Sequence, residues 1–211
     1  MSNQEELAKI AEEVKNCQKC PLYKTANKSV PGGPNPNAEI VFIGEAPGYW
    51  EDQKGIPFCG AAGKLLDQLL LMINLRRKDV FIGNILKHRP PNNRDPSPEE
   101  ITACTPYLKR QLLIMKPKLV ITLGRFAMNY FIPNVYISRV HGNLKRVLWE
   151  NLTLSIFPLY HPAAALRNGR VKEELKEDFK KIPEIIEQLS KQAPLPPPVP
   201  AKPEPKQGNL F

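Results

Sequence analysis

Four short runs of apolar, largely β-branched residues are spaced along the chain, and helical patterns lie between them. The runs are Glu39 to Gly44, Val80 to Leu86, Leu119 to Gly124 and Leu152 to Leu159. Runs of this length without polar alternation are typical of strands that are buried on both faces of a parallel sheet. Strands that alternate with helices predict an α/β fold, a three-layer α/β/α sandwich around a central four-stranded, mostly parallel sheet.

The helical patterns carry start signals as well as apolar spacing. Ser97 is a suitable N-cap, Pro98 a suitable first residue and Glu100 the partner of the cap, which predicts a helix from Pro98 to Met115. Other helices are predicted at Glu5 to Asn16, Ala61 to Asn74, Arg125 to Phe131 and Val171 to Gln188. Pro183 lies inside the last pattern and is of a residue type that kinks helices.

Composition divides the chain into one domain and a tail. A chain of 211 residues with 42% hydrophobic composition suits a single core, which we place in residues 1–192. Residues 193–211 are dominated by proline and cannot supply a core, so they are predicted to be a disordered, extended tether.

The charge and the missing targeting signals narrow the function classes. The formal net charge is +9, which favours a polyanionic partner such as nucleic acid. No segment approaches the roughly 18 apolar residues of a membrane span, and the charged N-terminus lacks a signal-peptide pattern. We therefore expect a cytoplasmic monomer with no membrane association.

Polar residues stand where three of the apolar runs end. Glu45 follows the first run, Asn84 lies in the second and His161 follows the fourth. Ligands of open parallel sheets bind beyond the carboxyl ends of the strands. The sequence therefore predicts that these three side chains share one site, although Asn84 also suits the plain role of closing a strand.

The cysteines point to a second kind of site. Cys17 and Cys20 form a CxxC pair, and Cys104 and His88 are available as distant partners. Because cytosolic thiols are normally reduced, metal or redox chemistry is favoured over a disulfide. This donor set suits zinc as well as an iron–sulfur cluster, and the plain alternative is buried cysteines without a ligand.

Several motifs in a fixed order resemble the family 4 uracil-DNA glycosylases, the iron–sulfur type of thermophiles. They are GEAPGYWED from Gly44, GIPFCGAAGKLLD from Gly55, NILKHRPPNNRDPSPEE from Asn84 and HPAAALR from His161. The resemblance implies a monofunctional glycosylase that hydrolyses the N-glycosidic bond of flipped-out deoxyuridine in single- and double-stranded DNA. Such a reaction starts base excision repair.

The resemblance also implies residue roles in uracil binding. Phe58 would stack on the base, unless it is simply a core residue, and Asn84 would read its Watson–Crick edge. His161 would donate to uracil O2 as the base leaves. Glu51 resembles the residue that crowds uracil C5 and excludes thymine.

The loop after the first strand completes the predicted pocket. Gly44 and Ala46 would line it, and Ala46 stands where many other uracil glycosylases have a water-positioning aspartate. Glu45 is therefore a candidate for orienting the water or for stabilising positive charge on the sugar, and the sequence does not choose between these roles.

Family 4 members hold a 4Fe-4S cluster with four cysteines, and this chain departs from that pattern. Cys17, Cys20 and Cys104 match ligand positions, whereas the remaining position holds His88. The resemblance implies a 4Fe-4S cluster with His88 as its fourth ligand, and zinc is the alternative.

Three further segments are candidate contact surfaces. Ala163, Leu166 and Arg167 resemble the loop that enters the minor groove. A second basic loop contains His141, Lys145 and Arg146, for which a solvated charge run is the plain alternative. The final QGNLF resembles a shortened sliding-clamp motif with Gln207, Leu210 and Phe211 as its anchors.

One rival function belongs to another class. The chain could be a non-catalytic DNA-binding or electron-transfer module in which only the metal site works. A uracil-excision assay separates this module from an enzyme.

Overall fold

Four parallel strands form the centre of the sheet in the computed structural model, which describes residues 1–149 and 152–191. They are β2 (Ile40–Gly44), β3 (Phe81–Asn84), β4 (Leu119–Leu123) and β6 (Leu152–Leu159), in the spatial order β3-β2-β4-β6. Each lies within one of the four apolar runs. The predicted parallel strands are therefore confirmed.

The described part of the sheet has six strands, so the predicted number of four is wrong. The two-residue β1 (Gly33–Pro34) pairs antiparallel with β3, and β5 (Lys145–Trp149) pairs antiparallel with β6. β5 is an edge strand with mostly exposed side chains, so it has no apolar run to mark it. Lys145 and Arg146, predicted in a basic loop, thus lie on a strand.

The predicted helices are present with small shifts at their ends. They are α1 (Asn3–Lys15), α3 (Ala61–Met72), α4 (Pro98–Met115), α5 (Arg125–Phe131), α8 (Gly169–Lys180) and α9 (Ile182–Lys191). The last predicted helix is two helices that meet at Lys181, and Pro183 lies at the second position of α9, where proline is tolerated. Ser97 and Glu100 form the predicted capping box of α4.

Several short helices were not predicted, because they are shorter than the window that periodicity needs. These are α2 (Tyr49–Lys54), α6 (Ile137–Val140) and α7 (Pro162–Ala165), with 3-10 turns at Pro21–Lys24, Arg77–Asp79 and Pro91–Asn93. Within the described ranges no helix is long and apolar enough to cross a membrane.

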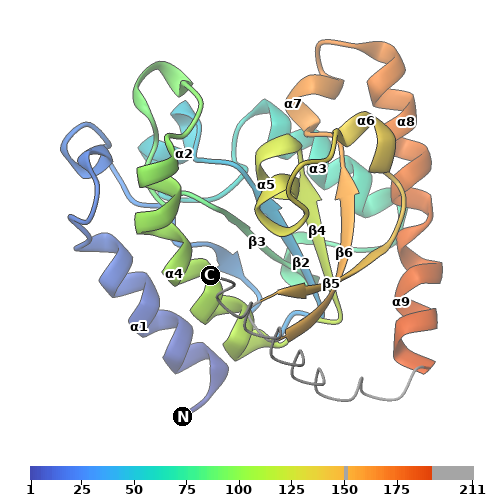
Figure 1. Ribbon diagram of the computed structural model, residues 1–211, viewed down its shortest axis with the longest axis horizontal. Helices are drawn as coiled ribbons and strands as arrows, with labels where there is room; N and C mark the ends of the chain where they lie inside the picture. The colour runs from blue at the N-terminus through green and yellow to red at the C-terminus, as the bar shows by residue number, and fades with distance from the viewer. Residues whose placement is uncertain (150–151, 192–211) are drawn as a thin grey trace, which may run out of the picture.

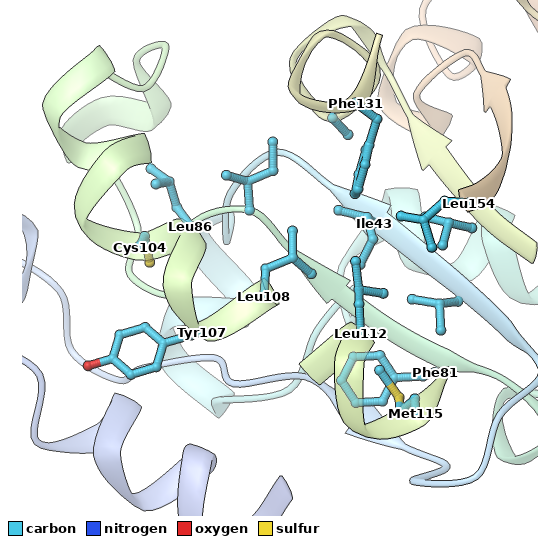
Figure 2. Close-up of a cluster of buried hydrophobic side chains, with 14 of the residues drawn as sticks. Ile43, Phe81, Leu86, Cys104, Tyr107, Leu108, Leu112, Met115, Phe131 and Leu154 are labelled. Atoms are coloured by element: carbon cyan, nitrogen blue, oxygen red, sulfur yellow. The ribbon is translucent and has the colours of Figure 1, made fainter. Parts of the chain in front are cut away.

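Alternate residues of the central strands feed two cores, one on each face of the sheet. Val41 and Ile43 of β2 belong to the core with α1 and α4, shown in part in Figure 2, where Leu108 and Leu112 of α4 lie near Ile43. Ile40 and Phe42 belong to the core with α3, α8 and α9. Helices thus cover both faces of the sheet (Figure 1), and the α/β/α sandwich is confirmed.

Candidate active site

The carboxyl ends of the central strands meet at one rim of the sheet. Gly44 at the end of β2 is in register with Asn84 at the end of β3, and Leu123 of β4 with Leu159 of β6. His161 follows β6 by two residues and caps α7. Figure 1 shows α2, α5 and α7 at the end toward which the arrows of β4 and β6 point.

The Phe58 ring and the Asn84 side-chain amide both lie close to the Cα atom of Gly44. A Cβ atom added to Gly44 would lie 2.4 Å from Oδ1 of Asn84 and 2.8 Å from the Phe58 ring. Any side chain here would displace both groups. The crowding at Gly44 gives its predicted pocket role a steric basis. Ala46 is half-buried and packs against the core that contains α4 side chains, and its place in the pocket stays a prediction.

Asn84 presents a buried acceptor that has no partner in the described residues. Its side chain is 1% exposed and its Oδ1 accepts no hydrogen bond. The Asn84 backbone is fixed, because Nζ of the buried Lys87 donates to its carbonyl at 2.9 Å and to Oε1 of Gln111 at 2.9 Å. Since an unpaired buried acceptor costs about 1–3 kcal/mol, this oxygen is suited to a ligand N–H.

His161 is held as a neutral imidazole of one tautomer. Its Nδ1 accepts the Ala163 backbone N–H at 3.1 Å, so the proton of the neutral ring lies on Nε2. Burial lowers the pKa of His161 to about 4. The ring therefore offers a neutral N–H donor at physiological pH.

Phe58 lies beside His161 on a constrained backbone. The two ring centroids are 5.5 Å apart with an interplanar angle of 31°. Phe58 has φ 50°, the left-handed region that few side chains adopt. Its carbonyl sits where a Cβ of Gly63 would be, 1.6 Å away, so only glycine fits at that position.

Arg77 fastens the Phe58 loop, and sequence reasoning missed it. Its guanidinium donates to the carbonyl oxygen of Pro57 at 2.8 Å and to that of Phe58, while its Nε donates to Asp67 at 2.8 Å. A bidentate, charged donor is well suited to fixing two adjacent carbonyls. Arg77 stands within a short polar stretch before β3, and nothing local in the sequence marks it.

Glu51 holds the other side of the same loop. Its Oε1 accepts the backbone N–H groups of Cys59 at 2.9 Å and Gly60 at 3.0 Å. One of its oxygens is thus used for loop structure. The exclusion of thymine by Glu51 stays a prediction.

Glu45 is half-buried at the end of β2. Burial raises its pKa, the nearby Asp95 adds to this effect and Arg125 opposes it. Asp95 and Arg125 form an ion pair at 2.6 Å. This pair lies near Glu45 although both residues are remote in sequence, so only the fold reveals it.

Comparison with known proteins identifies the family. The Uracil DNA glycosylase superfamily matches residues 31–187. The type-4 uracil-DNA glycosylase of Archaeoglobus fulgidus is 50% identical over 187 residues, 86% of this chain and 94% of that protein. This chain belongs to the type-4 uracil-DNA glycosylases. Those of Sulfurisphaera tokodaii (49% identity; 85% of this chain, 84% of that protein) and Thermotoga maritima (40%; 88% and 98%) agree.

In this type-4 glycosylase three of the four cysteines lie at one of the two cores, whereas Cys59 follows Phe58 in the pocket loop. Cys17 and Cys20 pack against the core that contains Cys104, whose Sγ accepts the Lys87 N–H at 3.1 Å. Burial raises the pKa of Cys104 to about 11, with small contributions from Cys17 and Cys20. The three predicted cysteine ligands are thus neighbours.

His88, the fourth predicted ligand, is buried. His88 is 7% exposed, and burial lowers its pKa while Asp52 opposes the effect. No three His, Cys, Asp or Glu side chains of the described residues are spaced to hold one metal ion. Three thiols and an imidazole are donors that zinc and iron–sulfur clusters both use, so these residue types fit either group.

The predicted DNA contacts of the glycosylase fall into two groups. Leu166 is 50% exposed and Arg167 is exposed at the end of α7, while Ala163 is half-buried within it. His141 instead is tied into the fold, with its Nδ1 2.7 Å from Oδ2 of the buried Asp178. Gln207, Leu210 and Phe211 lie outside the described residues.

Proposed function

We propose that this protein is a monofunctional uracil-DNA glycosylase that acts on deoxyuridine flipped out of DNA and starts base excision repair. Water attacks the anomeric carbon, the N-glycosidic bond breaks and uracil leaves as an anion. An abasic site remains in the DNA. The observation that carries this function is the unpaired Oδ1 of Asn84 beside the rings of Phe58 and His161.

The pocket matches uracil in shape and in hydrogen bonding. The Phe58 ring offers an aromatic face for the base. Oδ1 of Asn84 would accept from uracil N3–H while its amide nitrogen donates to O4. Cytosine presents the opposite polarity at both atoms, so it would leave the buried amide unpaired.

His161 would stabilise the leaving base. Negative charge collects on uracil O2 as the bond stretches, and the Nε2–H of His161 is the donor that this site keeps neutral. A preorganised donor at such a position contributes about 100- to 1000-fold in rate. Glu45, half-buried at the same strand end, is positioned to orient water or to stabilise the positive sugar.

The test is excision from matched oligonucleotides. Single- and double-stranded DNA with one uracil is incubated with the protein, heated in alkali and examined for strand cleavage, with thymine or cytosine at the same position as controls. Cleavage at uracil alone supports the proposal. An inactive protein with its metal centre intact would favour the non-catalytic module.

We also propose that Cys17, Cys20, Cys104 and His88 hold a 4Fe-4S cluster. The proximity of the Cys17 and Cys20 thiols to buried Cys104 supports it. The cluster would join α1 to α4, and no step of the hydrolysis needs it. Iron and sulfide assays with the visible spectrum test this assignment, because zinc is colourless.

We propose a sliding clamp as the partner of the tail, on sequence alone. Removal of Gln207 to Phe211 should weaken clamp binding and leave excision intact, and equal clamp binding by both forms would dismiss this partner. The cytoplasmic location and the monomeric state stay predictions.

A further inference from the structure

The short helix α2 turns its acidic side chains inward. Asp52 is 1% exposed and accepts from the backbone and side-chain amides of Asn27 at 2.8 and 2.6 Å. Glu51 accepts from Cys59 and Gly60. These bonds fix how the helix is rotated on the fold.

The same rotation leaves two aromatic rings on the outside. Tyr49 is 51% exposed and Trp50 is 55% exposed, with ring centroids 5.2 Å apart in an edge-to-face arrangement. Exposed large aromatic pairs are uncommon on a soluble surface unless they bind something. We call this pair the α2 aromatic pair.

Each ring of the α2 aromatic pair has one cationic side chain close to it. The Arg89 guanidinium lies 5.2 Å from the Tyr49 ring centroid, and Nζ of Lys54 lies 5.8 Å from that of Trp50. Of the two acidic residues of α2, Asp52 is buried, and Glu51 accepts two backbone N–H groups beside Trp50. The charged groups over the two ring faces are therefore the cations Arg89 and Lys54. A partner that combines flat rings with negative charge fits the pair and these cations, which describes the bases and phosphates of a single strand.

The α2 aromatic pair adjoins the proposed uracil pocket. A Cβ on Gly60 would lie 3.3 Å from Cδ1 of Trp50, and Gly60 is two residues from Phe58. His161, whose ring lies 5.5 Å from that of Phe58, begins α7, which leads to the exposed Leu166. Figure 1 shows α2 and α7 on different sides of the strand ends.

We propose that Tyr49 and Trp50 stack on unpaired bases next to the flipped uridine, while Lys54 and Arg89 contact the phosphates. The inference rests on the proposed function only for the position of the uridine. It assigns the enzyme a second binding site, selective for single-stranded DNA. In an intact duplex the neighbouring bases are already stacked and cannot use the pair.

Intrinsic fluorescence and affinity test the site without uracil. The chain has two tryptophans, and Trp149 is 8% exposed, so a ligand that stacks on Trp50 should quench the exposed fraction of the emission. We would titrate the full-length protein with an oligothymidylate and measure fluorescence and anisotropy. Trp50→Ala or Tyr49→Ala should weaken single-strand binding about 5-fold or more, and duplex binding far less.

Tyr136 provides a matched control on another element. It is 72% exposed and has the Arg139 guanidinium 5.6 Å from its ring centroid, so it repeats the chemistry of Tyr49 and Arg89 at α6. Tyr136→Ala should leave single-strand affinity unchanged. An equal loss in Tyr136→Ala would show that any exposed ring contributes and would overturn the α2 site.

Salt dependence separates stacking from charge. Arg89→Gln should reduce the slope of log K against log salt by about 0.7, the contribution of one phosphate contact to a single strand, whereas Trp50→Ala should lower affinity at an unchanged slope. Wild-type single-strand affinity in both aromatic variants would overturn the proposal and leave the pair to a protein partner. Because the oligonucleotide contains no uracil, this outcome is independent of whether the protein excises uracil.

Discussion

The uracil pocket and the cysteine region differ in how far contacts within the protein hold their functional groups in place. In the pocket, backbone and side-chain contacts already fix two functional groups: Ala163 sets the tautomer of His161, and Arg77 fixes the carbonyl of Phe58. In the cysteine region, Cys17, Cys20 and Cys104 share a core but are not spaced for one ion within the described residues.

This difference separates preorganisation for chemistry from assembly around a cofactor. A leaving-group donor works only if it is in place before charge develops, so the fold must hold it. Metal ligands can be drawn together by the metal, because its binding energy contributes to folding. Changes in the pocket should therefore alter rate and base choice, and changes near the thiols should alter metal content and stability.

Replacement of His161 should have the largest effect. His161→Ala removes the neutral donor, so kcat for uracil excision should fall about 100- to 1000-fold. Single-turnover rates and binding to DNA with a stable abasic analogue measure the two properties separately. Loss of both together would mean that the variant disturbs the fold.

Replacement of Asn84 should act on base choice. Asn84→Asp keeps the shape but replaces the amide donor, so uracil excision should fall about 5- to 150-fold, the equivalent of 1–3 kcal/mol. Relative excision of uracil and cytosine from matched oligonucleotides measures the change. Unchanged selectivity would remove Asn84 from the pocket.

Replacement of Arg77 tests whether the Phe58 loop is held from outside. Arg77→Met should raise KM and weaken inhibition by free uracil, and should lower the free energy of unfolding by about 1–3 kcal/mol. Arg76→Met is the matched control, because Arg76 is 63% exposed and lies 3.7 Å from Asp79. If Arg77→Met lowers the free energy of unfolding as expected but leaves KM unchanged, Arg77 has a purely structural role.

Replacement of His88 tests whether this residue is a metal ligand in the cysteine region. His88→Cys should retain iron as well as the wild type or better, with a shifted visible spectrum, because a fourth thiolate is the softer ligand. Iron content and absorption measure this. If neither changes, His88 is not a ligand.

The pH dependence of stability should show the smallest effect. The pKa of His161 is about 4 in the fold against an ordinary 6.5, so between these values the unfolded chain binds more protons. The stabilisation is therefore complete above pH 6.5 and is lost as the pH falls toward 4. Urea unfolding measures the free energy of unfolding at pH 7 and at pH 5. The decrease between the two pH values should be up to about 2 kcal/mol larger for the wild type than for His161→Gln.

Local sequence signals predicted the central fold well. The four parallel strands are apolar runs buried on both faces, and α4 carries its own cap and first-turn proline. β5 escaped prediction because an edge strand exposes polar side chains, and α2 and α7 because a few residues cannot show helical periodicity.

The sequence by itself determined which residue types stand at the strand ends, and with them that Glu45, Asn84 and His161 are candidates for one site, to which the family resemblance added Phe58. Only the tertiary structure decided how they work. The neutral tautomer of His161, the unpaired oxygen of Asn84 and the left-handed Phe58 held by Arg77 all depend on burial and on partners remote in sequence. Such contacts leave no local pattern, because the free energy that fixes each group comes from segments that folding alone brings together.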